Sequence, residues 1–160
     1  MEVRSLDRAD QASAEALVAD HFGSVRVVSR GRVHETVGLP CLTAYDSGVP
    51  VGLLHYRLDD AGDIEVVTLI AVQSRRGVGT ALLGALAEQA KAAGCRRVWL
   101  VTTNDNTNAQ HFYRACGWSL VAVHLGAVTS ARALKPEIPL LGEGCVAIED
   151  ELEYELVLRT

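Results

Sequence analysis

A short glycine- and arginine-rich stretch, QSRRGVGT, joins an apolar run to a helix-forming segment, and its residue types could bind an anion. Gly77 and Gly79 carry no side chain, so the backbone around them can approach a ligand closely. If a helix begins here, its first backbone N–H groups have no partner inside the helix and lie at the positive end of the helix dipole. Arg75 and Arg76 add positive charge at the same place. This combination favours a bound phosphate.

Two familiar phosphate motifs do not fit this stretch. The chain has no GxxxxGK[ST] sequence, which excludes a P-loop. It has no GxGxxG sequence either, and the strands predicted before the turn are antiparallel, which argues against a dinucleotide-binding fold. Taken alone, the turn could also be no more than a tight connection between a strand and a helix.

A second pattern follows the next predicted strand, in the sequence NTNAQHFYRACGW. It places Ala109 and Tyr113 at fixed steps after Asn106 and ends in the pair Gly117 and Trp118. In this order the two motifs resemble the GNAT superfamily of acetyl-CoA-dependent N-acetyltransferases, in which [RQ]xxGx[GA] precedes NxxAxxxYxxxG[FW]. The second motif matches in register throughout.

The resemblance covers residues 42–124 and implies a fold, a cosubstrate and a set of site residues. The implied fold is α/β (α+β), with a mixed, mostly antiparallel central sheet and helices on both faces. Acetyl-CoA is the implied cosubstrate, and no metal is implied. The turn would bind the CoA pyrophosphate, the strand before it would pair with the pantetheine arm, and Asn106 would cap its helix and contact the cofactor. The implied cofactor-binding residues are Leu69, Ile70, Ala71, Arg75, Arg76, Gly77, Val78, Gly79, Thr80 and Asn106.

The chain departs from the family pattern at one position of the first motif. The arginine or glutamine expected three residues before Gly77 is Ser74 here. The backbone part of a phosphate site does not depend on that side chain. Arg75 or Arg76 would then supply the side-chain charge.

Acetyl transfer to an amine needs a proton acceptor for the ammonium, an N–H group for the developing oxyanion and an acid for the leaving thiolate. By resemblance Tyr113 is the acid; the alternative is a tyrosine packed on the inner face of its helix.

Glu65 lies on the strand before the turn, where some members of the family carry a glutamate that deprotonates the amine through water. Burial there would make it a stronger base, whereas the alternative is a strand-end carboxylate in solvent. His55, His111 and His124 are rival bases that are more simply explained as structural.

The elements that must position these residues form an antiparallel meander followed by alternating helices and strands. A helix over residues 7–23 is predicted to bury Ala12, Ala16, Leu17 and His21. In the final strand, the glutamates that alternate with apolar residues predict a solvated face. Strands are predicted at 3–6, 25–28, 42–45, 51–58, 64–72, 96–103, 119–128 and 148–158, further helices at 78–93 and 106–116, and the glutamates are Glu151, Glu153 and Glu155.

Composition and charge limit the protein class. A chain of 160 residues with 49% hydrophobic residues predicts a single N-acetyltransferase domain, residues 1–160. A net charge of -5 without a long basic run argues against nucleic-acid binding and agrees with an amine substrate. The charged N-terminus and the lack of a long apolar run predict a cytoplasmic protein without a membrane segment. The four dispersed cysteines predict small buried hydrophobic residues and no metal site.

The function remains open among three interpretations. The first is direct attack of a primary amine, of a small molecule, on acetyl-CoA. The second is a non-catalytic CoA-binding sensor or partner module of the same fold, and the third is an unrelated α/β domain. By resemblance, residues 21–40 and 126–147 build the acceptor pocket. Their mixed charge fits a small polar amine that also bears an acidic group, although solvated loop charges explain it equally well. Homodimers are common in the family, so a homodimer stays open.

Overall fold

The computed structural model describes residues 1–73 and 76–159, so Ser74 and Arg75 of the predicted phosphate turn lie outside the described residues. The chain divides into two compact units. The first unit contains residues 1–27, 35–98 and those from 157 onward, and the second contains residues 28–34 and 99–156.

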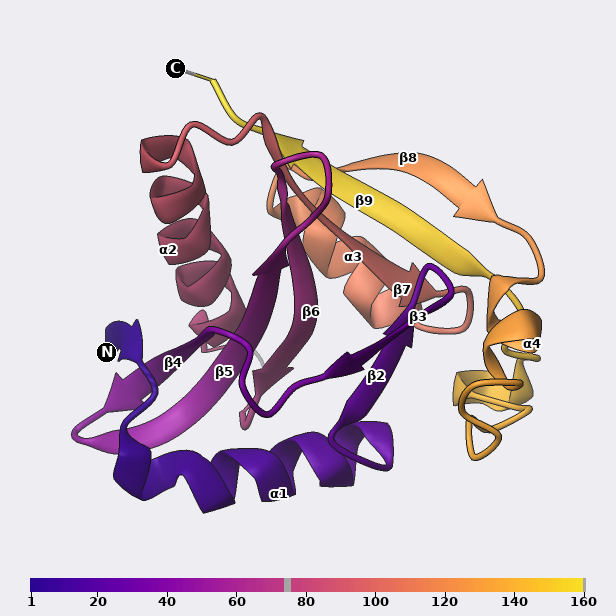
Figure 1. Cartoon of the computed structure of the whole chain (residues 1–160), viewed down its shortest axis with the longest axis horizontal. Helices are drawn as coiled ribbons and strands as arrows, with labels where there is room; N and C mark the ends of the chain where they lie inside the picture. Colours follow the sequence, from indigo (N-terminus) through magenta and orange to yellow (C-terminus); the bar gives the residue numbers. More distant parts are fainter. Residues whose placement is uncertain (74–75, 160) are drawn as a thin grey trace. The chain divides into compact units, whose positions relative to one another are not determined.

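The first unit is built around an antiparallel meander, as predicted. Its strands lie in the order β1-β4-β5-β6, and each neighbouring pair is antiparallel. A left-handed backbone at Ser47 and Gly48 makes the β4–β5 turn. The elements of this unit are β1 (Glu2–Ser5), η1 (Arg8–Asp10), α1 (Gln11–Phe22), β4 (Cys41–Asp46), β5 (Val49–Leu58), β6 (Ile64–Ala71) and α2 (Val78–Ala92), shown in indigo to rose in Figure 1.

Helix α1 covers one face of this meander. Ala14 and Val18 of α1 form a buried cluster with Leu53 of β5 and Ile70 of β6. The predicted inner face of the helix is therefore wrong, because Ala12, Ala16 and His21 are exposed and only Leu17 packs against the cluster. Because the helix contains many alanines, its sequence distinguishes only weakly between an apolar and a polar face. Packing against the sheet therefore determines which face is buried.

Helix α2 covers the opposite face, and a glycine allows it to lie close. Gly52 precedes Leu53 in β5, so the two positions face opposite sides of the sheet. A Cβ atom at Gly52 would lie 2.4 Å from Val78 Cγ1 and 2.8 Å from the Ile70 carbonyl oxygen. The first turn of α2 therefore rests directly on the backbone of β5.

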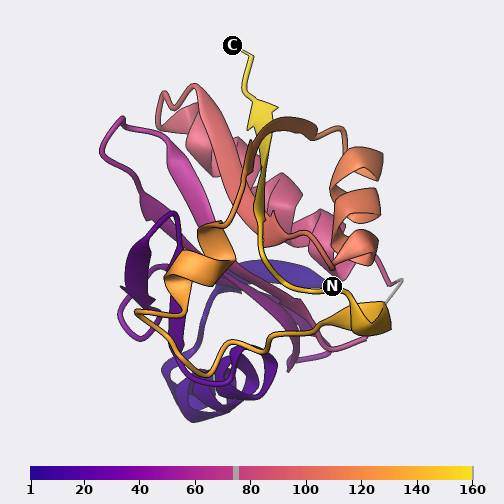
Figure 2. The same cartoon turned by 90° about the vertical axis from the view of Figure 1, so that its right-hand side faces the viewer.

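The second unit contains a smaller set of strands in the order β7-β9-β8, and β8 and β9 are antiparallel. The long connection before β9 is not a plain loop, because it begins with the short helix α4 (Figure 2). The elements are β7 (Arg97–Thr103), which begins in the first unit, α3 (Thr107–Ala115), β8 (Ser119–His124), α4 (Ala127–Ala131), η2 (Glu143–Cys145) and β9 (Glu151–Val157).

Two sequence expectations are wrong in this half. Strand β8 ends at His124 rather than near 128, because Gly126 adopts a left-handed backbone and its N–H donates to Asp150 Oδ1 at 2.8 Å. The glutamates of β9 do not form a solvated face. Glu151 is 4% exposed, and Glu153, whose side chain is 14% exposed, pairs with His124 Nε2 at 3.0 Å.

A β-hairpin replaces the single short strand predicted near residue 25. Strands β2 (Arg26–Ser29) and β3 (Arg32–Glu35) pair with each other and are joined by only Arg30 and Gly31. Both turn residues have positive φ, 49° and 73°, as type I′ hairpin turns require.

The close approach at Gly52 makes a stability prediction. We expect Gly52→Ala to lower the free energy of unfolding by about 1–3 kcal/mol, because the new methyl group overlaps Val78 and the rigid backbone of β6. Denaturant unfolding followed by circular dichroism measures this change. Gly84→Ala is the matched control: a Cβ there meets nothing within 4 Å, and alanine in a helix should raise stability by about 0.5–1 kcal/mol. Equal stability of Gly52→Ala and the native chain would contradict the close packing.

Candidate active site

The predicted anion turn ends at a helix whose first N–H groups point away from the helix body. Gly77 is the N-cap residue of α2, with φ 74°, and the first helical hydrogen bond runs from the Ala81 N–H to the Gly77 carbonyl at 3.0 Å. The backbone N–H groups of Val78 and Gly79 precede that bond and are therefore not used by the helix. Val78 is buried, whereas Gly77 and Thr80 are exposed, as is Arg76. The described part of the turn thus presents backbone donors at the surface.

Strand β6 leads into this turn and carries the residues predicted to pair with the pantetheine arm. Leu69, Ile70 and Ala71 lie opposite Leu54, Leu53 and Gly52 of β5, and the ladder continues with the Val72 N–H donating to the Val51 carbonyl at 2.9 Å. The pairing register shifts between His55 and Tyr56 of β5, so Val67 of β6 has no partner residue on β5. This bulge bends β6 just before its final residues.

Glu65 is buried in β6 and is paired with an arginine. Its side chain is 1% exposed, so a carboxylate in solvent is excluded. Arg57, its cross-strand neighbour in β5, donates to Glu65 Oε1 at 2.7 Å. This contact stabilises the ionised carboxylate, and a substrate proton that reached Glu65 would compete with Arg57 for it.

His55, one of the rival bases, has a structural role. It is 4% exposed, and burial lowers its pKa to about 4, so the imidazole is neutral near pH 7. Thr68 Oγ1 accepts the His55 backbone N–H at 3.0 Å and lies 2.8 Å from His55 Nδ1. The second contact is a hydrogen bond whose direction depends on the tautomer of the neutral ring. The other rivals differ: His111 is exposed on α3 and His124 is paired with Glu153.

The second motif forms the start and the inner face of α3. Asn106 caps the helix as predicted, because its Oδ1 accepts the Ala109 N–H at 3.1 Å. Tyr113 is 8% exposed, and its ring centroid lies 5.9 Å from that of Trp118 and 5.7 Å from that of Tyr154. Burial raises the pKa of the Tyr113 hydroxyl, so it stays protonated and can donate a proton or hydrogen bond.

The neighbouring Tyr154 hydroxyl is unusual. Its side chain is 0% exposed, and Tyr154 Oη is a buried atom without a hydrogen-bond partner among the described residues. A buried hydroxyl without a partner costs stability. The aromatic cluster therefore contains two buried tyrosines, of which Tyr154 is fully enclosed.

The segment before α3 holds the long connection in place, a role that neither motif predicts. Asn104 Oδ1 accepts the N–H groups of Glu149 and Asp150 at 2.9 and 3.0 Å, and Asn104 Nδ2 donates to the Ala147 carbonyl at 2.8 Å. Asp105 lies so close to Gly142 that a Cβ there would be 1.9 Å from Asp105 Oδ2. The polar triplet NDN after an apolar strand is the sequence signal for this role, but it does not name the partners.

Neither a metal centre nor a membrane-spanning helix is found in the part of the chain that the structure describes. No group of three or more His, Cys, Asp or Glu residues there could hold a metal ion. No described helix is long and apolar enough to cross a membrane.

Known proteins with a similar sequence or fold include acetyltransferases. Residues 10–118 match the model of the acetyltransferase (GNAT) family. The uncharacterized protein YdhI of Bacillus subtilis (strain 168) is 39% identical over 143 residues, which is 88% of each chain. A Bacillus subtilis acetyltransferase in complex with CoA is 15% identical over 99% of each chain, with a TM-score of 0.72. A GNAT family acetyltransferase of Elizabethkingia anophelis with acetyl-CoA bound is 12% identical, with a TM-score of 0.73, over 98% of this chain and 97% of that one.

These matches confirm the α/β (α+β) fold class and the family resemblance, which rested on the motifs at Gly77 and Asn106. The likeness to the two solved structures concerns the fold, because their sequence identity is low. The roles expected of single residues stay predictions.

The buried neutral His55 makes stability depend on pH. Its pKa is about 4 in the folded protein and 6.5 in the unfolded chain, so the unfolded chain binds more protons between these values. We expect stability to be full above pH 6.5 and to fall by up to about 3 kcal/mol as pH drops to 4, with no further loss from this residue below. Denaturant unfolding at several pH values measures it. His55→Gln should flatten this region of the profile, and His111→Gln should not; an unchanged slope in His55→Gln would contradict the assignment.

Proposed function

Because the chain belongs to the acetyltransferase (GNAT) family, we propose that it moves an acetyl group from acetyl-CoA to a primary amine of a small molecule, by direct attack of the amine. The observation that carries the proposal is the family match over residues 10–118, which contains the turn at Gly77 and the whole of α3. The whole chain would serve as one N-acetyltransferase domain.

Acetyl-CoA fits the features of the α2 turn. A pyrophosphate needs backbone donors at a helix end, and the turn offers those of Val78 and Gly79 together with the exposed Arg76, with Thr80 as a further proposed contact. Gly77 holds the left-handed backbone that opens this end, and Gly52 lets it rest on the sheet. One structural neighbour contains bound CoA and another contains bound acetyl-CoA, which supports the same choice. Arg75, outside the described residues, completes the proposed set, with Leu69, Ile70 and Ala71 of β6 along the pantetheine arm and Asn106 as a further contact.

The proposed catalytic groups are Tyr113 and Glu65. Acetyl-CoA supplies an activated acyl group. Tyr113 keeps its proton because its hydroxyl is buried, and it can deliver that proton to the sulfur that departs. Glu65 takes the proton that the attacking amine loses, relayed by water, while Arg57 holds the carboxylate in place. One proton enters the protein and one leaves it in each turnover.

A non-catalytic CoA-binding module remains the second candidate. The observation that favours it is the ion pair between Glu65 and Arg57, which already occupies the carboxylate proposed as the base. In that case acetyl-CoA would bind at the α2 turn without being consumed.

The cysteines support a reducing compartment such as the cytoplasm. All four, Cys41, Cys95, Cys116 and Cys145, are free thiols. The expectation that they are buried is confirmed for Cys95 and wrong for Cys145, which is exposed in η2, whereas Cys41 and Cys116 are half-buried. A homodimer remains compatible with the proposal, and no nucleic acid or membrane is invoked as a partner.

Titration calorimetry with acetyl-CoA, followed by a thiol-release assay over a panel of amines, tests the proposal. We expect micromolar binding, and we expect Tyr113→Phe to lower kcat by about 100-fold or more while binding stays unchanged. Tyr154→Phe is the matched control, because it removes a hydroxyl that is 0% exposed from the adjoining ring, and its activity should match that of the native protein. Binding without thiol release from any amine would favour the non-catalytic module. Absence of acetyl-CoA binding would contradict both the acetyltransferase and the CoA-binding module.

The two roles proposed for Asn106 can be separated. Aspartate caps helices as well as asparagine does, so Asn106→Asp should keep the unfolding free energy within about 0.5 kcal/mol, whereas Asn106→Ala should lose about 1 kcal/mol. Aspartate lacks the amide donor and adds negative charge, so we expect Asn106→Asp to weaken acetyl-CoA binding by about tenfold. Calorimetry and denaturant unfolding on both variants measure this. Native affinity in Asn106→Asp would leave Asn106 as a cap alone.

A further inference from the structure

A pocket in the second unit has the chemistry of a binding site, and no motif of the sequence accounts for it. Its volume is about 460 Å³, within the range of small-molecule sites. It lies between the β2–β3 turn and the segment from the end of β8 through α4. Its polar wall is formed by Arg30, His124 and Ser130, and its apolar wall includes Leu125, Ala127 and Leu134. We call it the β8–α4 pocket.

Arg30 is held in an unfavourable backbone conformation at the edge of this pocket. Its φ of 49° is in the left-handed region, where glycine, asparagine or aspartate is usual in such turns. A non-glycine residue there costs about 1–2 kcal/mol. Strain of this kind is often kept at sites where a side chain must be presented to a ligand.

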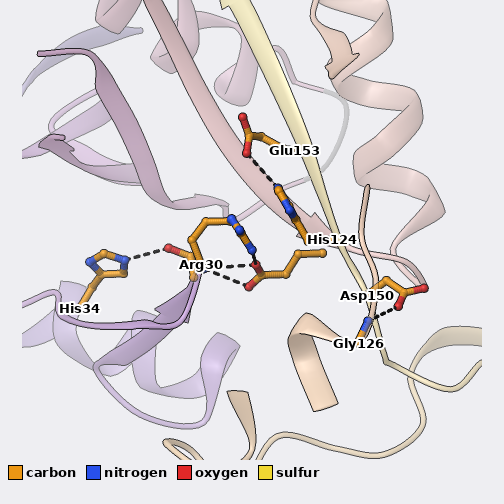
Figure 3. A network of polar contacts seen from close by, with 8 residues as sticks. Arg30, His34, His124, Gly126, Asp150 and Glu153 are labelled. Carbon is orange, nitrogen blue, oxygen red and sulfur yellow. Dashed lines mark hydrogen bonds and ion pairs between the residues drawn. The ribbon is translucent and has the colours of Figure 1, made fainter. Parts of the chain in front are cut away.

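Contacts with the buried carboxylate of Glu151 hold the backbone and the side chain of Arg30 (Figure 3). The Arg30 backbone N–H donates to both carboxylate oxygens of Glu151, at 3.1 and 3.3 Å, and Arg30 NH1 lies 3.4 Å from Oε1. Ser29 Oγ lies 2.8 Å from His34 Nε2, and both residues are buried, which ties the two strands of the hairpin together next to the turn. Only one guanidinium nitrogen faces Glu151, so the other donors of Arg30, a side chain that is 40% exposed, can meet a ligand.

The charged residues behind the pocket wall determine which ligand charges the pocket can accept. Asp150, Glu151 and Glu153 bring three carboxylates to β9 and its start, against the guanidinium groups of Arg30 and of Arg132, which donates to the Ile148 carbonyl at 2.8 Å. This surplus of negative charge disfavours a dianion such as a phosphate ester. A carboxylate can still bind the planar guanidinium of Arg30 through paired hydrogen bonds. The surplus favours a ligand that carries an ammonium group as well.

We propose that the β8–α4 pocket binds the carboxylate of the acceptor, so that the substrate is a free amino acid or a short derivative with an intact carboxylate. The proposal rests on the proposed acetyltransferase function. Arg30 is the specificity-determining residue, Glu151 positions it, and Leu125, Ala127 and Leu134 contact an aliphatic or aromatic side chain. The pocket joins parts of the two segments, 21–40 and 126–147, that the family resemblance assigns to the acceptor.

The test compares acceptors that differ only in the carboxylate. Thiol release is measured with L-leucine and isoamylamine, with L-phenylalanine and phenethylamine, with the other natural amino acids, and with phosphoethanolamine. The variant is Arg30→Asn, since asparagine suits the left-handed turn and keeps the backbone N–H that binds Glu151. Arg32→Asn removes the same charge from β3, outside the pocket wall, and is the matched control.

We expect amino acids to be used and their decarboxylated partners to be poor acceptors. Arg30→Asn should raise KM for the amino acids by about 10- to 100-fold, the loss expected for hydrogen bonds between charged groups, with kcat and acetyl-CoA affinity unchanged. Arg32→Asn should behave as the native protein does. Equal use of amines with and without a carboxylate, preference for phosphoethanolamine, or no use of any amino acid by a protein that binds acetyl-CoA would overturn the proposal.

A second measurement does not depend on turnover. Calorimetric titration with N-acetyl-L-leucine, N-acetyl-L-phenylalanine and N-isoamylacetamide tests the pocket alone. The two acids should bind at least about tenfold more tightly than the amide, and Arg30→Asn should abolish the difference. Failure of acetyl-CoA binding together with this carboxylate-dependent binding would overturn the acetyltransferase function but not the pocket. Absence of carboxylate-dependent binding would overturn the pocket whatever the fate of acetyl-CoA.

Discussion

The close contact between the first turn of α2 and the backbone of β5 at Gly52 governs the arrangement of the first unit. Only a hydrogen atom fits between this strand and Val78, and the Ile70 carbonyl lies on the same side. The start of α2 therefore lies against β5 at Gly52, and Gly52 pairs with Ala71, the final residue of β6. A turn whose backbone must meet a phosphate depends on such placement, because the donors are fixed by the helix rather than by flexible side chains.

Buried carboxylates that pair with more exposed arginines form the second theme of the molecule. Glu65 pairs with Arg57, Asp63 with Arg96, and Glu151 with Arg30. Breaking such a pair is costly, because it leaves a charge without compensation in a poorly solvated place. Asp63 illustrates the structural use, since its carboxylate also accepts the Arg96 backbone N–H at 3.0 Å and so joins the start of β6 to the approach of β7. Glu151 does the same for the β2–β3 turn.

Polar groups near the aromatic cluster differ in how completely they are satisfied. Asn106 and Asn104 both use their side-chain amides on backbone partners, which fixes the start of α3 and the long connection. Tyr113 and Tyr154 lie in the same ring cluster, where Tyr113 is 8% exposed and Tyr154 is fully enclosed. Burial raises the pKa of the Tyr113 hydroxyl, so this hydroxyl keeps its proton near neutral pH.

The sequence by itself determined the meander, the three longer helices and the cap at Asn106, because each depends on neighbours a few residues apart. The motifs around Gly77 and Tyr113 were readable for the same reason, and so was the family. Tertiary structure alone decided which face of α1 is buried, that Glu65 meets Arg57, and that Glu151 and Glu153 are not solvated. It also made the β2–β3 hairpin and α4 into walls of one pocket. Partners such as Arg30 and Glu151 are 121 residues apart, and the alternation of a strand tells which side a residue faces but not what lies there.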